Sequence, residues 1–245
     1  MTAGPLALVG GDEFHPGNEA QDALLCEAAA GRPAYIVATA ARDNPEAAVA
    51  TAQRWFRRFD VDVTELRVRT VTEARSTVTA EQAKAAGLIY ICGGDPGRVV
   101  RVLRGCLVWD AIRDAWRGGC ALAGSSAGAM ALCEWSLVRR GFPGHTDRRG
   151  LEGLNLVPGS AFLPHYDTFG ERWIPSAQES VGAETLLIGV DERSAAVWVD
   201  GAWSAMGPGR VVLVRSNERR VSSAPSAIDG LPQPDAGEAN QPSAG

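Results

Sequence analysis

The sequence predicts an α/β fold built on a doubly wound, mostly parallel sheet with helices on both faces. Short apolar runs alternate with longer amphipathic runs along the chain, in the order βαβαβαβαβ. Several of the short runs are apolar throughout, as expected for strands that helices cover on both sides. The last strands follow one another closely, so we expect an antiparallel portion near the C-terminus.

Hydrophobic periodicity and segment length assign the individual elements. Strands are expected at residues 5–10, 34–40, 61–68, 87–92, 120–124, 186–190, 195–199 and 210–214. Helices are expected at residues 19–30, 45–59, 80–86, 98–116 and 127–135. The apolar residues of 98–116 recur at three- to four-residue steps, which predicts a core-facing stripe and leaves room for a break near Gly105.

Two segments lack this regular pattern. Residues 138–166 are rich in glycine and proline, and a segment this long inside a compact domain is usually functional. Residues 217–245 are dominated by Ser, Pro, Gly and Ala, which predicts a disordered tail. We therefore expect one α/β hydrolytic domain over residues 1–216, followed by that tail.

Composition excludes several classes of protein. The chain has 245 residues, 45% of them hydrophobic, a net charge of -5, and 24 scattered Lys and Arg residues. These values give no support for a nucleic-acid or membrane partner, and no apolar run approaches the roughly 18 residues of a membrane span. The N-terminal stretch reads as a first strand rather than a signal peptide. Five cysteines without C-x-x-C spacing argue against disulfides and zinc, and favour the cytoplasm.

The stretch Gly124-Ser125-Ser126-Ala127-Gly128 matches G-x-S-x-G, between a predicted strand and a predicted helix. A nucleophile on such a sharp turn has strained backbone angles, and its neighbours two residues away must be very small. A plain glycine- and serine-rich crossover is the alternative. The strand–turn–helix setting favours Ser126 as a nucleophile.

A second glycine turn, Gly93-Gly94-Asp95-Pro96, ends another predicted strand. In open α/β sheets, this edge is where sites assemble. The backbone N–H groups of Gly94 and Ala127 are the candidate oxyanion donors. Asp95 and Pro96 also suit the start of a helix, and both roles are compatible.

A serine nucleophile needs a base, and the chain has only His15, His145 and His165. His165 ends a segment that resembles a strand, whereas the other two lie in loops. A strand end holds a side chain more firmly than a glycine-rich loop does, so we favour His165.

Residues 10–14 spell "GGDEF", the signature of diguanylate cyclases. There the motif lies deep inside a domain, with metal-binding acids on an upstream strand, whereas here only nine residues precede it. We interpret the match as coincidence, and the stretch as the loop after the first strand at the active edge of the sheet.

Four stretches together resemble the cyanophycinase and aspartyl dipeptidase (peptidase E) family of serine peptidases, which shares its fold with class I glutamine amidotransferases. They are "ICGGDPGRVVRVL", "AGSSAGAMALCEW", "LEGLNLVPGSAFLPHYD" and "LLIGVDERSAAV", within residues 5–214. The resemblance implies Ser126 as nucleophile, His165 as base, and Gly94 and Ala127 as oxyanion donors. It implies no cofactor and no metal.

The family's acid lies between the nucleophile and the histidine, and Asp147 best fits that loop. Glu152 is the fallback, and Glu134, expected on the helix after Ser126, is read as structural. Asp191 and Glu192 match a family "DE" pair that we read as site architecture. The expected triad is therefore Ser126–Asp147–His165.

Two turns depart from the family pattern. Cyanophycinases usually have Gln where this chain has Pro96, and Asp-Gln where it has Leu163-Pro164. The chemistry is thus better retained than the specificity for cyanophycin or for acidic substrates.

The sequence predicts a hydrolase of small peptides or amides, with a homodimer left open. A non-catalytic binding or regulatory member of the family is the alternative. An α/β-hydrolase-type esterase is a weaker one, since no histidine follows His165.

Overall fold

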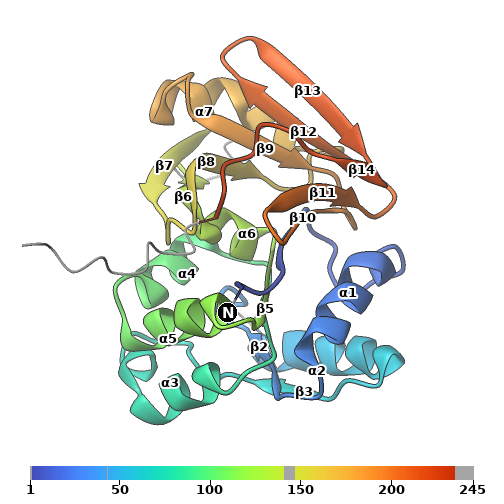
Figure 1. The fold of residues 1–245 in the computed structure, drawn as a ribbon. Helices are drawn as coiled ribbons and strands as arrows, with labels where there is room; N and C mark the ends of the chain where they lie inside the picture. Colours follow the sequence, from blue (N-terminus) through green and yellow to red (C-terminus); the bar gives the residue numbers. More distant parts are fainter. Residues whose placement is uncertain (1, 43, 141–146, 235–245) are drawn as a thin grey trace, which may run out of the picture.

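The structure, a computed structural model, describes residues 2–42, 44–140 and 147–234. Within these residues the chain forms two sheets (Figure 1). The first has the order β14-β11-β10-β1-β5-β4-β2-β3, and the second has the order β13-β12-β9-β8-β6-β7. The predicted α/β class with a large, mostly parallel sheet is confirmed, whereas the second sheet was not predicted.

The centre of the first sheet is parallel. It contains β1 (Leu6–Val9), β5 (Ala121–Ser125), β4 (Leu88–Ile91), β2 (Ala34–Val37) and β3 (Val63–Glu65). Its other end is antiparallel, through β10 (Ala195–Val199), β11 (Ala202–Met206) and β14 (Ser226–Ala227). All side chains of β1, β4 and β5 are buried, as expected for strands covered on both faces.

Helices cover both faces of this sheet because alternate strand residues point to opposite sides. On one side, α1 (Glu19–Ala29) and α2 (Pro45–Phe56) pack on Ala7, Val9 and Tyr90. On the other, α3 (Thr77–Lys84), α4 (Pro96–Leu103) and α5 (Leu107–Arg117) pack on Leu8 and Ile91 (Figure 1). The short 3-10 helices η1 (Arg57–Phe59) and η2 (Glu73–Arg75) connect the elements of this half.

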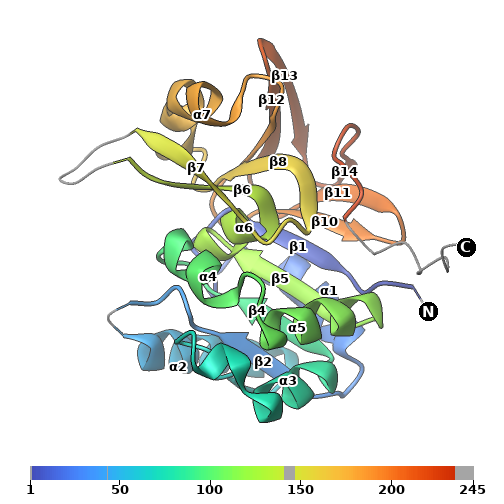
Figure 2. The ribbon, with the colours of Figure 1, turned by 90° about the vertical axis from the view of Figure 1, so that its left-hand side faces the viewer.

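The second sheet lies above the first and carries a helix of its own (Figure 2). Parallel strands β6 (Cys133–Arg139), β8 (Val157–Leu163) and β9 (Leu186–Val190) form its centre. Antiparallel strands β7 (Arg148–Glu152), β12 (Arg210–Arg215) and β13 (Glu218–Ser223) flank them. The helix α6 (Ala127–Leu132) joins the two sheets, and η3 (Gly170–Trp173) leads into α7 (Ile174–Val181).

Three sequence-based assignments need correction. The helix expected at 127–135 ends at Leu132, because Trp135 and its neighbours pair with β7 and β8. The segment 138–166, which lacked a pattern, contains β7 and β8, whose pairing depends on distant strands. The tail expected to be disordered from 217 forms β13 and β14, and Ile228 and Leu231 are buried. Residues 235–245 lie outside the described residues.

The segment 98–116 does break near Gly105, for which the sequence pattern left room. Helix α4 ends at Leu103 and α5 begins at Leu107, with Gly105 between them at a φ of +65°. Glycine takes this left-handed conformation at no steric cost. Within the described ranges, no helix combines the length and the apolar character that crossing a bilayer requires.

Candidate active site

Ser126 lies at the apex of the turn between β5 and α6, with φ 47° and ψ −106°. Its backbone N–H donates to the carbonyl oxygen of Val9 at 2.9 Å, which ties the turn to β1. A Cβ on Gly124 would lie 2.7 Å from the nitrogen of Ala129, and one on Gly128 would lie 2.3 Å from the oxygen of Ile91. Only glycine therefore fits at these two positions of the G-x-S-x-G motif, as the sequence predicts.

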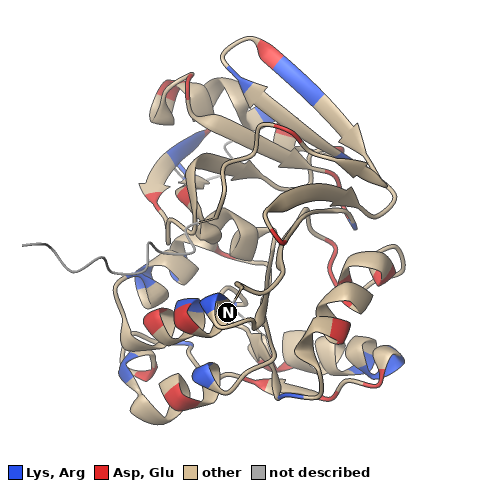
Figure 3. Cartoon of the chain, in the orientation of Figure 1, with Lys and Arg blue, Asp and Glu red and all other residues tan. Residues whose placement is uncertain are grey.

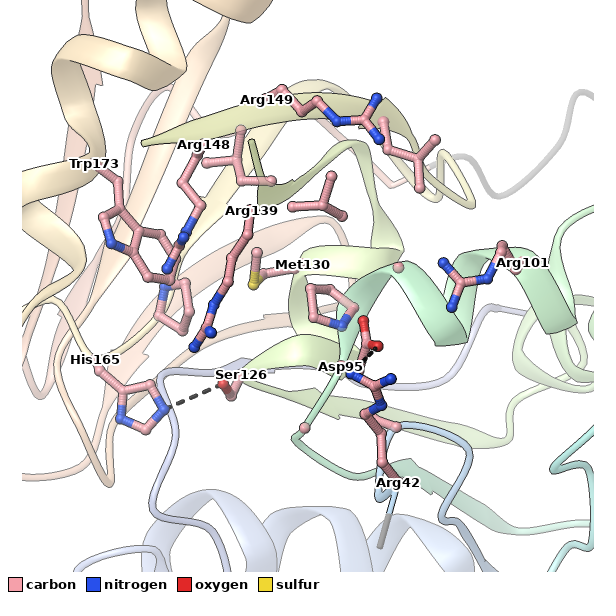
Figure 4. Close-up of a pocket in the computed structure, with 18 of the residues that line it drawn as sticks. Arg42, Asp95, Arg101, Ser126, Met130, Arg139, Arg148, Arg149, His165 and Trp173 are labelled. Carbon is pink, nitrogen blue, oxygen red and sulfur yellow. Dashed lines mark hydrogen bonds and ion pairs between the residues drawn. The ribbon is translucent and has the colours of Figure 1, made fainter. Parts of the chain in front are cut away.

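His165 follows β8 and faces Ser126 across the junction of the two sheets (Figure 4). Its Nε2 lies 3.2 Å from Ser126 Oγ. Its backbone has a φ of 48°, and its N–H donates to the carbonyl oxygen of Gly10 at 2.7 Å. The "GGDEF" loop thus lies at the active edge of the sheet, as expected from the sequence.

Glu192, directly after Asp191 and the end of β9, is the acid that contacts this histidine. Its Oε1 lies 2.6 Å from His165 Nδ1. Because a carboxylate only accepts hydrogen bonds, Nδ1 donates to it, and Nε2 is left to accept the Ser126 hydroxyl proton. The backbone N–H of Glu192 donates to Asp167 Oδ1 at 3.1 Å, which fixes the turn that carries the acid.

The prediction that Asp147 completes the triad is not supported by this geometry. Asp147 is exposed, immediately before β7, and its carbonyl oxygen accepts from Arg140 at 3.2 Å. The fallback acid, Glu152, forms an ion pair with Arg104. Glu134 lies on β6 rather than on a helix, and its Oε2 accepts the N–H of Gly159 at 2.7 Å, which is the expected structural role.

The "DE" pair divides into two roles. Asp191 is 5% exposed, and its Oδ2 accepts from the backbone and side-chain nitrogens of Arg210, both at 2.9 Å. Glu192 instead points to His165. The signal for Glu192 was its place just beyond a strand's carboxyl end, the same signal that favoured His165.

Of the remaining predicted site residues, Gly94 lines the cavity beside Ser126, with a φ of +138°. Ala127 is the first residue of α6 and is buried. The backbone N–H groups of both have no hydrogen-bond acceptor among the described residues. His15 is exposed and contacts Asp12 at 3.2 Å, and His145 lies outside the described residues.

A cavity of about 850 Å³ opens over Ser126 and His165. The loop at 40–42, the turn at 94–97, α4, β6 and β7 form most of its wall, and Phe169 and Trp173 close one side. The ring of Phe169 stacks on His165 with centroids 4.8 Å apart. Pro96 and Pro164, which replace polar family residues, both line this space.

Arginines dominate the charge of the cavity wall. Arg139 and Arg148 lie near each other on β6 and β7 (Figure 4). Burial, and then the neighbouring Arg139 guanidinium, lower the pKa of Arg148 to about 10. The Arg148 guanidinium lies 3.8 Å from the ring centroid of Trp173, so an aromatic face supports it.

Three further arginines line the cavity, Arg42, Arg101 and Arg149. Arg42 lies 3.5 Å from Asp95, the one acidic residue among the described residues that line the cavity. Figure 3 shows acidic and basic residues interspersed over the fold, with consecutive basic residues on β7. Among the described residues, the cavity wall therefore has five Arg and one Asp, a formal charge of 5 − 1 = +4.

The chain is similar to known proteins that agree in family. The model of peptidase family S51 matches residues 6–205. A cyanophycinase of Trichormus variabilis is 31% identical over 164 residues, which are 64% of this chain and 54% of the relative. A cyanophycinase of Synechococcus elongatus is 26% identical over 201 residues, 78% of this chain and 61% of the relative. The matched part of the chain thus spans between half and two thirds of these relatives' length.

Two solved structures have folds similar to that of this chain. A peptidase from an acI-B1 actinobacterium has a TM-score of 0.80 at 27% identity, covering 92% of this chain and 96% of that one. A putative peptidase E protein from Listeria monocytogenes EGD-e has a TM-score of 0.55 at 14% identity, covering 91% and 99%, and supports the fold alone. With the family model matching most of its length, the chain belongs to peptidase family S51, as its resemblance to cyanophycinases and peptidase E predicted.

Proposed function

We propose that the chain is a serine-type peptidase or amidohydrolase that acts on small peptides or amides through Ser126, His165 and Glu192. The observation that carries the proposal is the continuous line of contacts from Ser126 Oγ to His165 Nε2, and from His165 Nδ1 to Glu192 Oε1. A nucleophile, a base within hydrogen-bond reach, and a third group that orients the base are the parts this chemistry needs.

In the proposed reaction, Ser126 Oγ attacks the substrate carbonyl carbon while His165 Nε2 takes the hydroxyl proton. The N–H groups of Gly94 and Ala127 donate to the oxyanion that forms. His165 then returns the proton to the leaving amine as the C–N bond breaks, which leaves an acyl group on Ser126. Water, deprotonated by His165, attacks this ester and releases the acid. Glu192 keeps Nδ1 protonated and stabilises the imidazolium throughout.

The cavity wall supports a substrate that carries carboxylates. Arg139 and Arg148 place two guanidinium groups close together, and a planar carboxylate matches guanidinium geometry in a bidentate way. This observation outweighs the expectation that the altered turns disfavour acidic substrates. Because Pro96 and Pro164 still replace polar family residues in the same space, we do not propose cyanophycin itself.

A fluorophosphonate probe tests the nucleophile directly. We expect one covalent adduct, mapped by mass spectrometry to Ser126, and none in Ser126→Ala or on Ser125. His165→Ala should slow the labelling by about 10²-fold or more, because general-base assistance is lost. Absence of an adduct in wild-type protein with a cooperative unfolding transition would contradict the proposal, and would favour a non-catalytic binding role.

The location and assembly stay predictions. All five cysteines are unpaired thiols, which supports the cytoplasm as the proposed location. A homodimer is testable by light scattering of the purified chain.

A further inference from the structure

The loop of residues 10–14, the "GGDEF" stretch, contacts both halves of the site. The carbonyl oxygen of Gly10 accepts the N–H of His165 at 2.7 Å. Gly11 has a φ of +127°, and a Cβ on it would lie 2.3 Å from His165 Cε1. This loop therefore packs against His165, and its later residue Glu13 contacts Ser125, which precedes Ser126.

Glu13 joins two turns that are distant in the sequence. Its Oε1 accepts the backbone N–H of Gly93 at 2.8 Å, and its Oε2 accepts the hydroxyl of Ser125 at 2.9 Å. Gly93 directly precedes Gly94, and Ser125 directly precedes Ser126. A Cβ built on Gly93 would lie 3.0 Å from Glu13 Oε1 and 3.3 Å from Ser126 Cβ, so the three groups are in close contact.

We propose that Glu13 is a positioning residue, which holds the oxyanion turn at Gly94 in register with the nucleophile Ser126. The inference rests on the proposed function and adds a residue to it. Gly93 and Gly94 have no side chains to anchor the turn, so hydrogen bonds of its backbone hold the peptide planes, such as that from the Asp95 N–H to the Ala40 oxygen at 3.0 Å. A charge-assisted hydrogen bond to the Gly93 N–H fixes the plane before Gly93, and thereby the direction of the next N–H, that of Gly94.

Glutamate suits this position better than glutamine. Both of its oxygens accept, which matches one N–H and one O–H donor, whereas a Gln side chain has only one accepting oxygen. The next residue, Phe14, anchors the backbone, since it is 7% exposed with its ring 5.0 Å from Tyr90 and 5.7 Å from Phe56. The packing of Phe14 thus fixes the backbone next to Glu13, while the Glu13 carboxylate contacts the two turns.

Glu13→Ala and Glu13→Gln test this role through steady-state kinetics on a reactive peptide anilide. We expect Glu13→Ala to lower kcat by about 10²-fold with KM within about threefold, because misplaced donors fail the transition state rather than the bound substrate. Glu13→Gln keeps the acceptor for Gly93 and should recover at least a tenth of the wild-type kcat. A folded Glu13→Ala enzyme with wild-type kcat, or a loss confined to KM, would overturn the proposal.

The control is Glu19→Gln. Glu19 also accepts a backbone N–H, that of Gly17 at 2.6 Å, but contacts neither turn of the site. Its kcat should match the wild type.

Amide hydrogen exchange tests the same contact without turnover. Glu13→Ala should raise the exchange rate of the peptide that contains Gly93 and Gly94 by tenfold or more, with no change in Glu19→Gln. Unchanged exchange in Glu13→Ala would overturn the positioning role, even in a chain that reacts with fluorophosphonate. Faster exchange in a chain that never forms the adduct would instead locate the failure in the proposed function.

Discussion

Ser126 presents its hydroxyl to His165 because its backbone has a positive φ, a conformation that costs a non-glycine residue free energy. The surrounding contacts hold the Ser126 backbone in this conformation. Gly124 and Gly128 pack against backbone atoms on either side, and the Ser126 N–H is bonded to Val9. His165 also has a positive φ, so both residues depend on the fold for their geometry.

Glu192→Gln should lower kcat by about 10²- to 10⁴-fold with little change in KM. A neutral amide no longer favours the Nδ1-protonated ring or stabilises the imidazolium. Asp147→Asn, the matched change at the other candidate acid, should leave kcat within about twofold, because Asp147 is exposed and Glu192 is the acid that contacts the ring. Steady-state kinetics of the two variants decide between the acids, and a larger loss in Asp147→Asn would contradict the assignment.

The sequence predicted that Ser126 and His165 share one site because both have local signatures. Ser126 lies in a five-residue motif, and His165 is one of only three histidines. The acid has no such signature among 29 Asp and Glu residues, and the expectation from the family loop pointed to Asp147. The position of Glu192 just beyond a strand's carboxyl end points to His165 only once β9 pairs with β8, which brings its turn to the histidine.

At the scale of elements, the contact between α1 and α2 buries a carboxyl group. Asp22 is fully buried, and its Oδ2 accepts the indole N–H of Trp55 at 2.7 Å. Burial raises the pKa of Asp22 to about 7, the Trp55 hydrogen bond opposes this rise, and the charges of Glu13 and Glu19 add to it.

This carboxyl predicts a pH-dependent stability. Unfolded Asp loses its proton near pH 4, so between about pH 4 and 7 the native state binds more protons than the unfolded state. The free energy of unfolding should therefore fall as the pH rises through this window. We expect Asp22→Asn, which keeps an acceptor for Trp55, to show a Tm that falls several degrees less from pH 5 to pH 8.

Asp62→Asn is the control, because Asp62 is 92% exposed and should reproduce the wild-type slope. Calorimetry at matched ionic strength measures all three proteins. If Tm falls equally with pH in the wild type and in Asp22→Asn, then Asp22 titrates alike in the native and unfolded states, which would contradict the prediction.

The C-terminal strands predict a second effect on stability. Truncation after Ser216 removes β13, which pairs with β12 over residues 218–223, and the buried side chains Ile228 and Leu231. Each such side chain contributes about 1.5–3 kcal/mol, and β12 would become an exposed edge. We expect a loss of at least ~3 kcal/mol in urea unfolding, or insoluble protein. Truncation after Pro234 keeps both strands and is the control.

The elements that the sequence predicted well are those whose own side chains specify them. The parallel strands β1, β4 and β5 are apolar throughout, and Gly105 breaks the helix pattern locally. The elements it missed depend on partners. β13 has five exposed residues out of six, so only its pairing with β12 makes it a strand. The first residues of β6 have a helix-like sequence pattern. They form a strand because the distant strand β8 pairs with them.

For the whole molecule, the charge of the cavity opposes that of the chain. The net charge is -5, yet the part of the cavity wall that the structure describes holds five arginines and one aspartate. A cleft of one sign focuses the field and attracts ligands of the opposite sign.

This contrast predicts a salt effect on substrate binding. For a peptide with a carboxylate side chain, KM should rise about threefold or more between 50 and 300 mM salt, because screening shortens the range of the attraction. The matched amide peptide, Asn for Asp, should respond little. Arg139→Gln should weaken the preference for the acidic peptide. Equal salt responses for both peptides would contradict the anionic substrate class.

The residues of the proposed site come from both sheets. Ser126 follows β5 of the first sheet, whereas His165 and Glu192 follow β8 and β9 of the second. Neither sheet alone holds a nucleophile together with its base, so a partly folded chain is inert even with one sheet complete. During refolding, fluorophosphonate reactivity should therefore return with the docking of the two sheets, later than most of the secondary structure. If the proposed chemistry is correct, such a chain has no peptidase activity until its own folding is finished.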